Sequence, residues 1–433
     1  MQRLRTAALV TVAPALAICL FGAVTGRPAI WQPAAVFAAL AAAIGIRALE
    51  RLASFQFTAW ILAAVTVGMI YPRYCLSVGP IDLRNKWLLL FVVQAVMFGM
   101  GTQMHLRDFA GVLRMPWGVV VGLACQFSVM PLVGYALIHL FTFPPEIAAG
   151  VILIGSCSSG LASNVMVYFA RGNLALSITL TSVATMLAPL FTPLWMRFLA
   201  GALVEVSVEK MKLDIVKIVL VPMGAALLAD ALTSASPRTR RVAGVLACLT
   251  GGLLIASTLV WERYVVATTS DQMQNRLALL NFTLGAYTVG AAYYFVCERL
   301  PAVRRVTPLA SMFGIIYFTA VTTAAGRDNL LTVGVSLFLA AVLHNALGYC
   351  FGFTLSRLCG LNRTDARTVA FEVGLQNGGM ASGIAGSMGK LGTLGLASAI
   401  FSPWMNISGS LLANFWRRRE AAVADDDDKT TSA

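Results

Sequence analysis

Two stretches of the chain place oxygen-bearing side chains among glycines and serines inside long apolar runs. The first reads GSCSSGLASN from Gly155 to Asn164, and the second reads FEVGLQNGG from Phe371 to Gly379. The second contains Glu372, an ionisable residue in otherwise uncharged surroundings. Ionisable side chains inside membrane-length apolar runs are costly, and they mark pathways for ions or substrates. The two stretches therefore predict a polar site enclosed by apolar segments.

Oxygen is the donor atom that these stretches offer to a ligand. The oxygen-bearing side chains are those of Ser163, Asn164, Glu372 and Gln376. Ser177 and Thr181 follow on the next apolar segment with the i, i+4 spacing that places both hydroxyls on one helical face. A hard cation such as Na⁺ takes several oxygen ligands, by the logic that governs Ca²⁺ and Mg²⁺. The pattern predicts a sodium site.

Each of these features also has a purely structural interpretation. Serine and threonine hydroxyls in helices often bond the carbonyl four residues earlier, which would account for Ser177 and Thr181. Glycine-rich stretches mark close helix packing in membranes. Glu372 alone could act as a protonated hydrogen-bond donor between helices. A pair of Gly-interrupted segments in the two halves of a chain, however, is typical of transporters built on inverted repeats.

The rest of the chain is typical of an all-α polytopic membrane protein. Of its 433 residues, 58% are apolar and only 12% are charged, and its mean hydropathy is +0.78. Soluble domains carry about twice that share of charge. We predict fourteen membrane segments, near 7–26, 31–48, 55–72, 87–104, 117–141, 147–170, 173–196, 213–231, 242–261, 278–297, 307–325, 330–356, 366–388 and 392–415.

The net charge of +13 does not indicate a nucleic-acid partner, because the arginines lie in short loops beside apolar runs. Their distribution favours an inner (plasma) membrane protein with both termini in the cytoplasm. The eight cysteines are scattered without ligand spacing, so they predict neither a disulfide framework nor a zinc site. The residues leave the oligomeric state open.

The two ends of the chain have interpretations of their own. Arg3 and Arg5 followed by an apolar stretch ending near Gly26 also fit a cleaved signal peptide, which would leave the later topology unchanged. We expect residues 418–433, with their run of four aspartates, to form a disordered cytoplasmic tail.

Three separated motifs resemble the bile acid:sodium symporter family. They are CSSGLASNVMVYFARGNLALSITLT from Cys157, TVAFEVGLQNGGMA from Thr368 and FSPWMNISGSLLANFWR from Phe401. The similarity covers residues 55–235 and 305–417. It implies an inverted-repeat transporter with core and panel domains and two broken, crossing helices. The chain looks like a bacterial homologue with four additional helices.

The resemblance implies a division of the chain. Residues 55–235 would hold the first five-helix repeat plus the first helix of the second repeat, and residues 305–417 the remainder of the second repeat. Residues 1–54 and 236–304 would each add a helix pair beside the panel. Because each insertion is a pair, the orientation of the following segments is preserved.

The resemblance also assigns residues to ligands. It implies two sodium ions: one held by Ser163, Asn164, Ser177, Thr181 and Glu372, the other by Glu372, Gln376, Gln126 and the backbone carbonyls of Val373 and Leu375. No organic cofactor is implied. The transported anion would lie against Gly160, Leu161, Asn377 and Gly378. Leu161 stands where the family commonly has a hydroxyl, so the substrate class remains open.

We therefore predict a secondary active transporter that carries a small organic anion, bile-acid-like, pantoate-like or a keto acid, by sodium symport with alternating access. A proton-coupled carrier of the same fold, with Glu372 as the proton site, is one alternative. A non-transporting membrane sensor is another. An intramembrane hydrolase using Ser158 or Ser159 would require a facing base, and we do not expect an enzyme.

Overall fold

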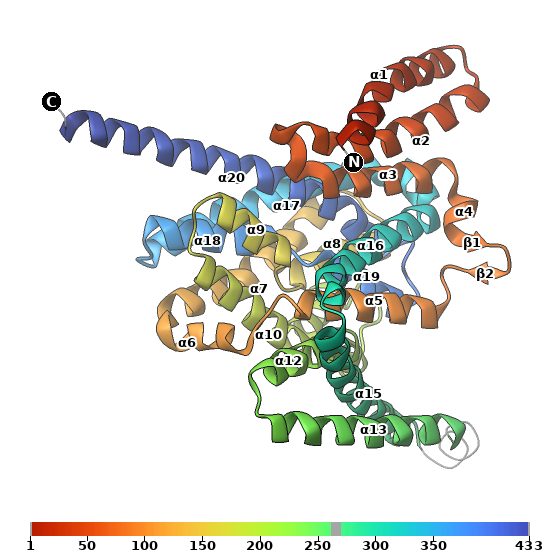
Figure 1. Ribbon diagram of the computed structural model, residues 1–433. Helices are drawn as coiled ribbons and strands as arrows, with labels where there is room; N and C mark the ends of the chain where they lie inside the picture. Colours follow the sequence, from red (N-terminus) through yellow and green to blue (C-terminus); the bar gives the residue numbers. More distant parts are fainter. Residues whose placement is uncertain (1, 261–269, 432–433) are drawn as a thin grey trace.

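The computed structural model describes residues 2–260 and 270–431, which are almost entirely helical (Figure 1). In chain order the helices are α1 (Gln2–Val24), α2 (Pro28–Gly45), α3 (Gln56–Ile70), α4 (Pro72–Leu76), α5 (Lys86–Gly101), α6 (Gly111–Arg114), α7 (Pro116–Leu140), α8 (Pro145–Ser156), α9 (Leu161–Phe169), α10 (Leu174–Ala200), α11 (Val208–Ile215), α12 (Val221–Ser234), α13 (Pro237–Val260), α15 (Asp271–Arg299), α16 (Ala302–Ala325), α17 (Arg327–Leu358), α18 (Arg363–Gly374), α19 (Gly378–Ser387) and α20 (Leu396–Thr431). A π-helical turn, Val216–Leu220, joins α11 to α12. The strands β1 (Ser77–Val78) and β2 (Ile81–Asp82) form a small antiparallel hairpin.

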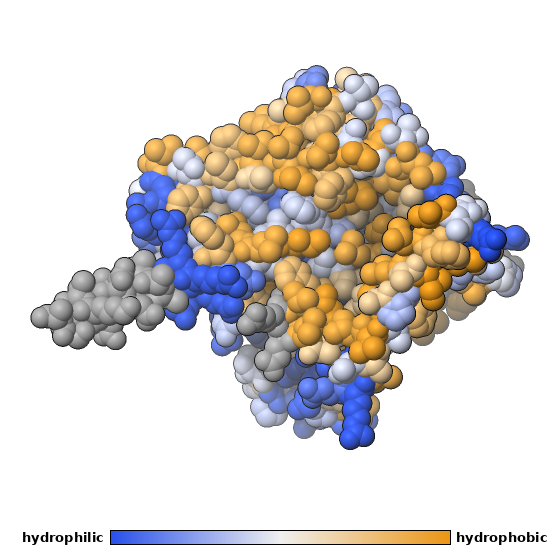
Figure 2. Space-filling view, turned by 90° about the horizontal axis from the view of Figure 1, so that it is seen from above, coloured by the Kyte–Doolittle hydropathy of each residue, from blue (hydrophilic) through white to orange (hydrophobic). Residues whose placement is uncertain are grey.

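Each of the fourteen predicted membrane segments coincides with one helix or with a broken pair of helices. Eight helices within the described ranges are long and apolar enough to cross a membrane, or nine when the bent pair Lys86–Gly101 and Leu106–Arg114 counts as one span. The remaining segments are shorter, broken or less apolar. Hydrophobic residues cover the middle of the face in Figure 2, and hydrophilic residues gather along its edges. The prediction of an all-α polytopic membrane protein is confirmed.

Local sequence signals fix where the helices begin. Proline occupies the first position of α7 and α8, where its missing N–H costs nothing. The side chains of Asn173 and Asn362 accept hydrogen bonds from the first turns of α10 and α18. These signals place the ends of the helices that carry the predicted site residues.

The helices pack in two groups. The first, which we call the core bundle, comprises α7–α10 and α17–α20. Its broken helices pack between α7, α10, α17 and α20. The second, which we call the panel, comprises α3, α5, α11, α12 and α16, with α16 packed on both α3 and α5. The two groups meet along a seam where α5 lies against α19.

The two helix pairs that the sequence predicted as additional to the five-helix repeats pack on the panel. The α1–α2 hairpin lies on α3, and the α13–α15 pair lies on α12 (Figure 1). Residues 261–269, between α13 and α15, lie outside the described ranges. Neither pair separates the two halves of the core bundle.

The helix α20 continues to Thr431 at the carboxyl-terminal end and projects away from the bundle (Figure 1). Disorder of the tail from residue 418 on stays a prediction. Ala421, Ala422 and Ala424 are strong helix formers, and they extend a helix that the apolar core has already nucleated.

Candidate functional site

The two broken helices cross at their breaks. Helix α8 ends at Ser156 and α9 begins at Leu161, while α18 ends at Gly374 and α19 begins at Gly378. Between them the backbones are extended and pair antiparallel, with Ser159 opposite Gln376. The N–H of Gly160 donates to the Leu375 carbonyl (3.1 Å), and the N–H of Asn377 donates to the Ser158 carbonyl (2.8 Å). Each break thus satisfies backbone groups of the other, which a bilayer interior requires.

Side chains complete the second break. The Asn345 Nδ2 donates to the Gly374 carbonyl (2.7 Å), and the Ser408 hydroxyl donates to the Asn345 Oδ1. On the far side, the Asn377 Oδ1 accepts from the Met380 N–H (3.0 Å) and so caps α19. Asn345 therefore positions the end of α18.

The Glu372 carboxylate lies at the centre of an oxygen cluster, and only 1% of the residue is exposed. Ser177 donates to its Oε1 (2.5 Å), while Ser159 (2.6 Å) and Thr181 (2.8 Å) donate to its Oε2. The Asn164 Oδ1 lies 2.7 Å from the Ser177 hydroxyl and 3.2 Å from the Thr181 hydroxyl. Three helices, α9, α10 and α18, and the first break converge on one acid.

Ser163 completes this cluster. Its hydroxyl donates to the Gly160 carbonyl (2.7 Å) and lies 3.4 Å from the Thr181 hydroxyl. All five residues predicted for the first sodium ion are therefore together: Ser163, Asn164, Ser177, Thr181 and Glu372. Their grouping follows from the i, i+4 spacing on α10 and from the crossing of the breaks.

The residues predicted for the second ion form an adjoining cluster. The Gln126 Nε2 donates to the Cys157 carbonyl (3.0 Å) and to the Gln376 Oε1 (2.9 Å). The Gln376 Nε2 in turn donates to the Val373 carbonyl (2.6 Å). The Gln126 Oε1 is buried without a hydrogen-bond partner. The Leu375 carbonyl already accepts from Gly160 in the bridge, so it has one lone pair left for any ligand.

The four residues predicted for the anion line one cavity of about 370 Å³ between the core bundle and the panel. These residues are Gly160, Leu161, Asn377 and Gly378. None of the described residues that line this cavity is charged. Its walls are mostly apolar, with Ile61, Met312 and Ile315 among them, and its polar groups include the amides of Gln376 and Asn377. The Asn377 Nδ2 is buried without a partner.

This central cavity continues toward the end of the molecule that bears the free end of α20. A second cavity of about 530 Å³ shares Phe57, Met312 and Ser410 with it and adds Arg47 and Arg417. At the opposite end the seam is closed. A Cβ on Gly383 of α19 would lie only 2.5 Å from the Val93 Cγ2 of α5, and one on Gly379 would lie 3.3 Å from the Met97 Cε.

One member of the oxygen cluster was not predicted from the sequence. Ser159 contacts Glu372 directly, yet the sequence could not distinguish it from its neighbour Ser158, whose hydroxyl contacts Thr185 (3.2 Å) and the Met380 sulfur (3.8 Å). The alternation of an extended backbone sends adjacent side chains to opposite faces. The hydrolase alternative gains no support, because the His344 ring contacts the Met130 carbonyl instead of either serine.

Comparison with known proteins gives consistent matches. The model of the sodium bile acid symporter family matches residues 88–269. An uncharacterized sodium-dependent transporter of Bacillus subtilis, YocS, is 29% identical over 375 residues, which cover 86% of this chain and 94% of that protein. The probable chloroplastic sodium/metabolite cotransporter BASS1 of Arabidopsis thaliana is 27% identical, covering 86% and 76%. The human ileal sodium/bile acid cotransporter is 26% identical, covering 69% and 68%.

Proposed function

We propose that this chain, which belongs to the sodium bile acid symporter family, is a symporter that uses two sodium ions to drive a small organic anion across a membrane by alternating access. Its relatives are sodium-dependent transporters and cotransporters, so sodium-coupled transport is the general function that the family supports. The oxygen cluster around Glu372 is the observation that carries the finer proposal.

The cluster has more oxygen–oxygen contacts than hydroxyl protons. Seven contacts of 2.5–3.4 Å involve the hydroxyls of Ser159, Ser163, Ser177 and Thr181. Each hydroxyl has one proton, so four protons are shared among seven contacts. Oxygens without a proton between them repel unless a cation neutralises them. A dehydrated sodium ion would relieve this repulsion, and every available donor is an oxygen, as a hard cation requires.

A proton on Glu372 is the alternative. It would supply one further hydrogen for the cluster and neutralise the carboxylate. At least three contacts lack a hydroxyl proton, so protonation accounts for fewer of them than a cation that several oxygens share. We therefore favour sodium coupling over proton coupling at this site.

The second sodium ion would use the adjoining oxygens. The free Gln126 Oε1 and the Val373 carbonyl lie in a network with Gln376, four residues after Glu372. Binding of one cation would order the Glu372–Gln376 segment for the other, since both sites would draw oxygens from it. This ordering would couple the two binding events.

The anion would bind in the central cavity against the amino-terminal ends of α9 and α19. Helix amino ends carry free N–H groups and a positive end of the helix dipole, which together favour anions. The unpartnered Asn377 Nδ2 offers an additional donor. Because the described lining has no cationic side chain, these neutral donors would hold the acid group, and the sodium ions behind the crossing would supply the positive charge.

Transport would then alternate the access of this cavity. The central cavity continues toward the end of the molecule that bears the end of α20. At the opposite end, contact between α5 and α19 closes the seam. Separating α19 from α5 would expose the crossing to the opposite side. We propose that the core bundle moves against the panel to do this, with both termini in the cytoplasm and the protein in the inner membrane.

Flux measurements in proteoliposomes test the proposal. Anions that raise the melting temperature only in the presence of NaCl would first be selected by thermal shift. We expect uptake of such an anion to require an inward sodium gradient and to be stimulated by an inside-negative potential. Uptake that continues when choline replaces sodium at fixed pH would refute sodium coupling. Sodium-dependent binding without any flux would favour a sensor.

A further inference from the structure

Four of the chain's six lysines gather at the closed end of the seam. Lys86 begins α5, Lys210 and Lys212 lie on α11, and Lys217 lies in the π-helical turn after it. They line two adjoining cavities of about 220 and 750 Å³ that share Lys86, Lys210 and Lys217. We refer to these two cavities together as the vestibule.

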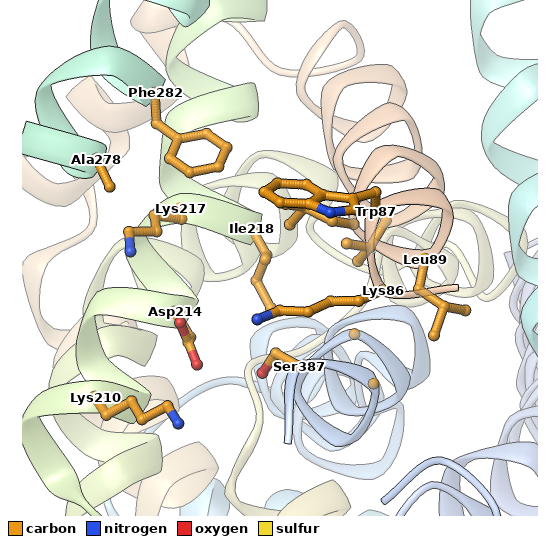
Figure 3. Close-up of a pocket in the computed structure, with 14 residues that line it drawn as sticks. Lys86, Trp87, Leu89, Lys210, Asp214, Lys217, Ile218, Ala278, Phe282 and Ser387 are labelled. Carbon is orange, nitrogen blue, oxygen red and sulfur yellow. The ribbon is translucent and has the colours of Figure 1, made fainter. Parts of the chain in front are cut away.

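The vestibule carries an excess of positive charge. Its described lining holds five cationic side chains, the four lysines and Arg276, against the two carboxylates of Glu209 and Asp214. Figure 3 shows the side chains of Lys86, Lys210 and Lys217 arranged around Asp214, with Ser387 at the end of α19 facing the same carboxylate. One acid cannot neutralise three surrounding ammonium groups, so the cluster attracts a further anion.

The smaller cavity is also strongly apolar on one side. Trp87 of α5 faces Ala278 and Phe282 of α15 across it (Figure 3). Leu90 of α5 also lines this cavity. The Lys217 Nζ lies 5.8 Å from the centre of the Phe282 ring, within the range of a cation–π contact. Cations at the rim and aromatic walls below them match a molecule with an acid group on an apolar body.

Helix α15 belongs to the predicted inserted pair, so the vestibule is partly built by residues outside the two predicted five-helix repeats. Its position relative to the central cavity is defined by two helices. On α5, Lys86 and Val93 line the vestibule and Met100 lines the central cavity. On α19, Gly383 lines the vestibule and Gly379 lines the central cavity. The α5–α19 contact lies between the two sites.

We infer that the vestibule binds an amphiphilic organic anion in front of the closed seam, with the acid group at Lys86, Lys210 and Lys217 and the apolar body between Trp87 and Phe282. The same chemistry belongs to an anion awaiting transport and to an anionic lipid at the membrane surface. The first source rests on the proposed function; binding at the vestibule itself does not.

Paired fluorescent probes test the site. The full chain in phosphatidylcholine nanodiscs would be titrated with 8-anilinonaphthalene-1-sulfonate and with the neutral N-phenyl-1-naphthylamine, which share an aromatic body, and empty nanodiscs would be subtracted. We expect the triple variant Lys86→Gln, Lys210→Gln, Lys217→Gln to bind the sulfonate roughly tenfold more weakly or worse, since each exposed charge contributes modestly. Binding of the neutral probe should not change.

Three controls make the result specific. Arg84→Gln removes a cation from the same end of the molecule but outside the vestibule, and it should leave both probes unaffected. Phe282→Ala should weaken the binding of both probes, because it removes the apolar wall that both would contact. Lys210→Gln alone, at an exposed position that folding should tolerate, should weaken only the sulfonate.

Wild-type affinity for the sulfonate in the triple variant, or equal losses for both probes, would overturn the inference. Adding phosphatidylglycerol to the nanodiscs distinguishes the sources: competition that depends on the three lysines identifies a lipid, and its absence identifies a free anion. Glu372→Gln should lose sodium responses while keeping sulfonate binding. The two readouts therefore distinguish failure of the proposed anion binding at the vestibule from failure of the proposed sodium coupling.

Discussion

Ser159 and Gln376 lie opposite each other in an antiparallel bridge between the two helical breaks, although 216 positions separate them in the chain. The bridge orients the Ser159 side chain toward Glu372 and the Gln376 side chain toward Gln126. It therefore connects the two oxygen clusters through one pair of residues. Any ligand that orders one cluster acts directly on the backbone of the other.

Ser159→Ala should weaken sodium binding by about tenfold, because it removes a hydroxyl that contacts a buried carboxylate at 2.6 Å. Sodium-dependent thermal stabilisation would measure this change. Ser156→Ala is the matched control, since its buried hydroxyl bonds only the Ile152 carbonyl of its own helix. Equal sodium affinity in both variants would remove Ser159 from the site.

Gln126→Ala should reduce the cooperativity of sodium activation. The substitution removes a free buried oxygen from the second cluster while leaving the contacts of Glu372 intact. We expect the Hill coefficient of sodium-driven uptake to fall from near two toward one. Gln94→Ala, which loses one bond to the Lys217 carbonyl in the panel, should retain the wild-type coefficient. An unchanged coefficient in Gln126→Ala would contradict the second ion site.

Two substitutions at Asn377 separate capping from anion binding. Asn377→Asp keeps an oxygen that caps α19 but replaces the unpartnered Nδ2 donor with a negatively charged oxygen. It should keep the α19 cap and weaken the binding of the anion selected by thermal shift. Asn377→Ala should also lose about 1 kcal/mol of stability with the cap. Undiminished anion binding by Asn377→Asp would place the acid group elsewhere.

Gly383→Ala should favour opening of the seam, because the added Cβ would lie 2.5 Å from the Val93 Cγ2. Overpacking of this kind costs about 1–3 kcal/mol in the closed state. A cysteine at Leu161 in the central cavity would report the change through faster labelling by an impermeant thiol reagent on the β1–β2 side. Adding Val93→Ala should restore slow labelling. Labelling that ignores both substitutions would exclude this contact as the closure.

Much of the fold could be predicted from the sequence because the bilayer imposes a simple rule on length and polarity. The apolar runs became helices, and the glycine- and serine-rich interruptions became breaks. The grouping of Ser163, Asn164, Ser177, Thr181 and Glu372 was predicted jointly by residue type, spacing and family resemblance. Their role in sodium binding remains a prediction.

Other features depended on long-range packing that spacing alone does not determine. Ser159 contacts Glu372 because of the register of the bridge. A shift of that register by one residue would give this role to Ser158. The vestibule requires Lys86 to meet Lys210 and Lys217 from another helix, and no local pattern connects them.

Direct measurement of bound sodium tests the central claim. Equilibrium binding of radioactive ²²Na⁺ to the purified chain would be compared between the wild type and Glu372→Gln, with Cys75→Ala as a control at a buried position outside the site. We predict two sodium ions bound per chain in the wild type and in the control, and loss of this binding in Glu372→Gln. Wild-type sodium binding by Glu372→Gln would contradict the account.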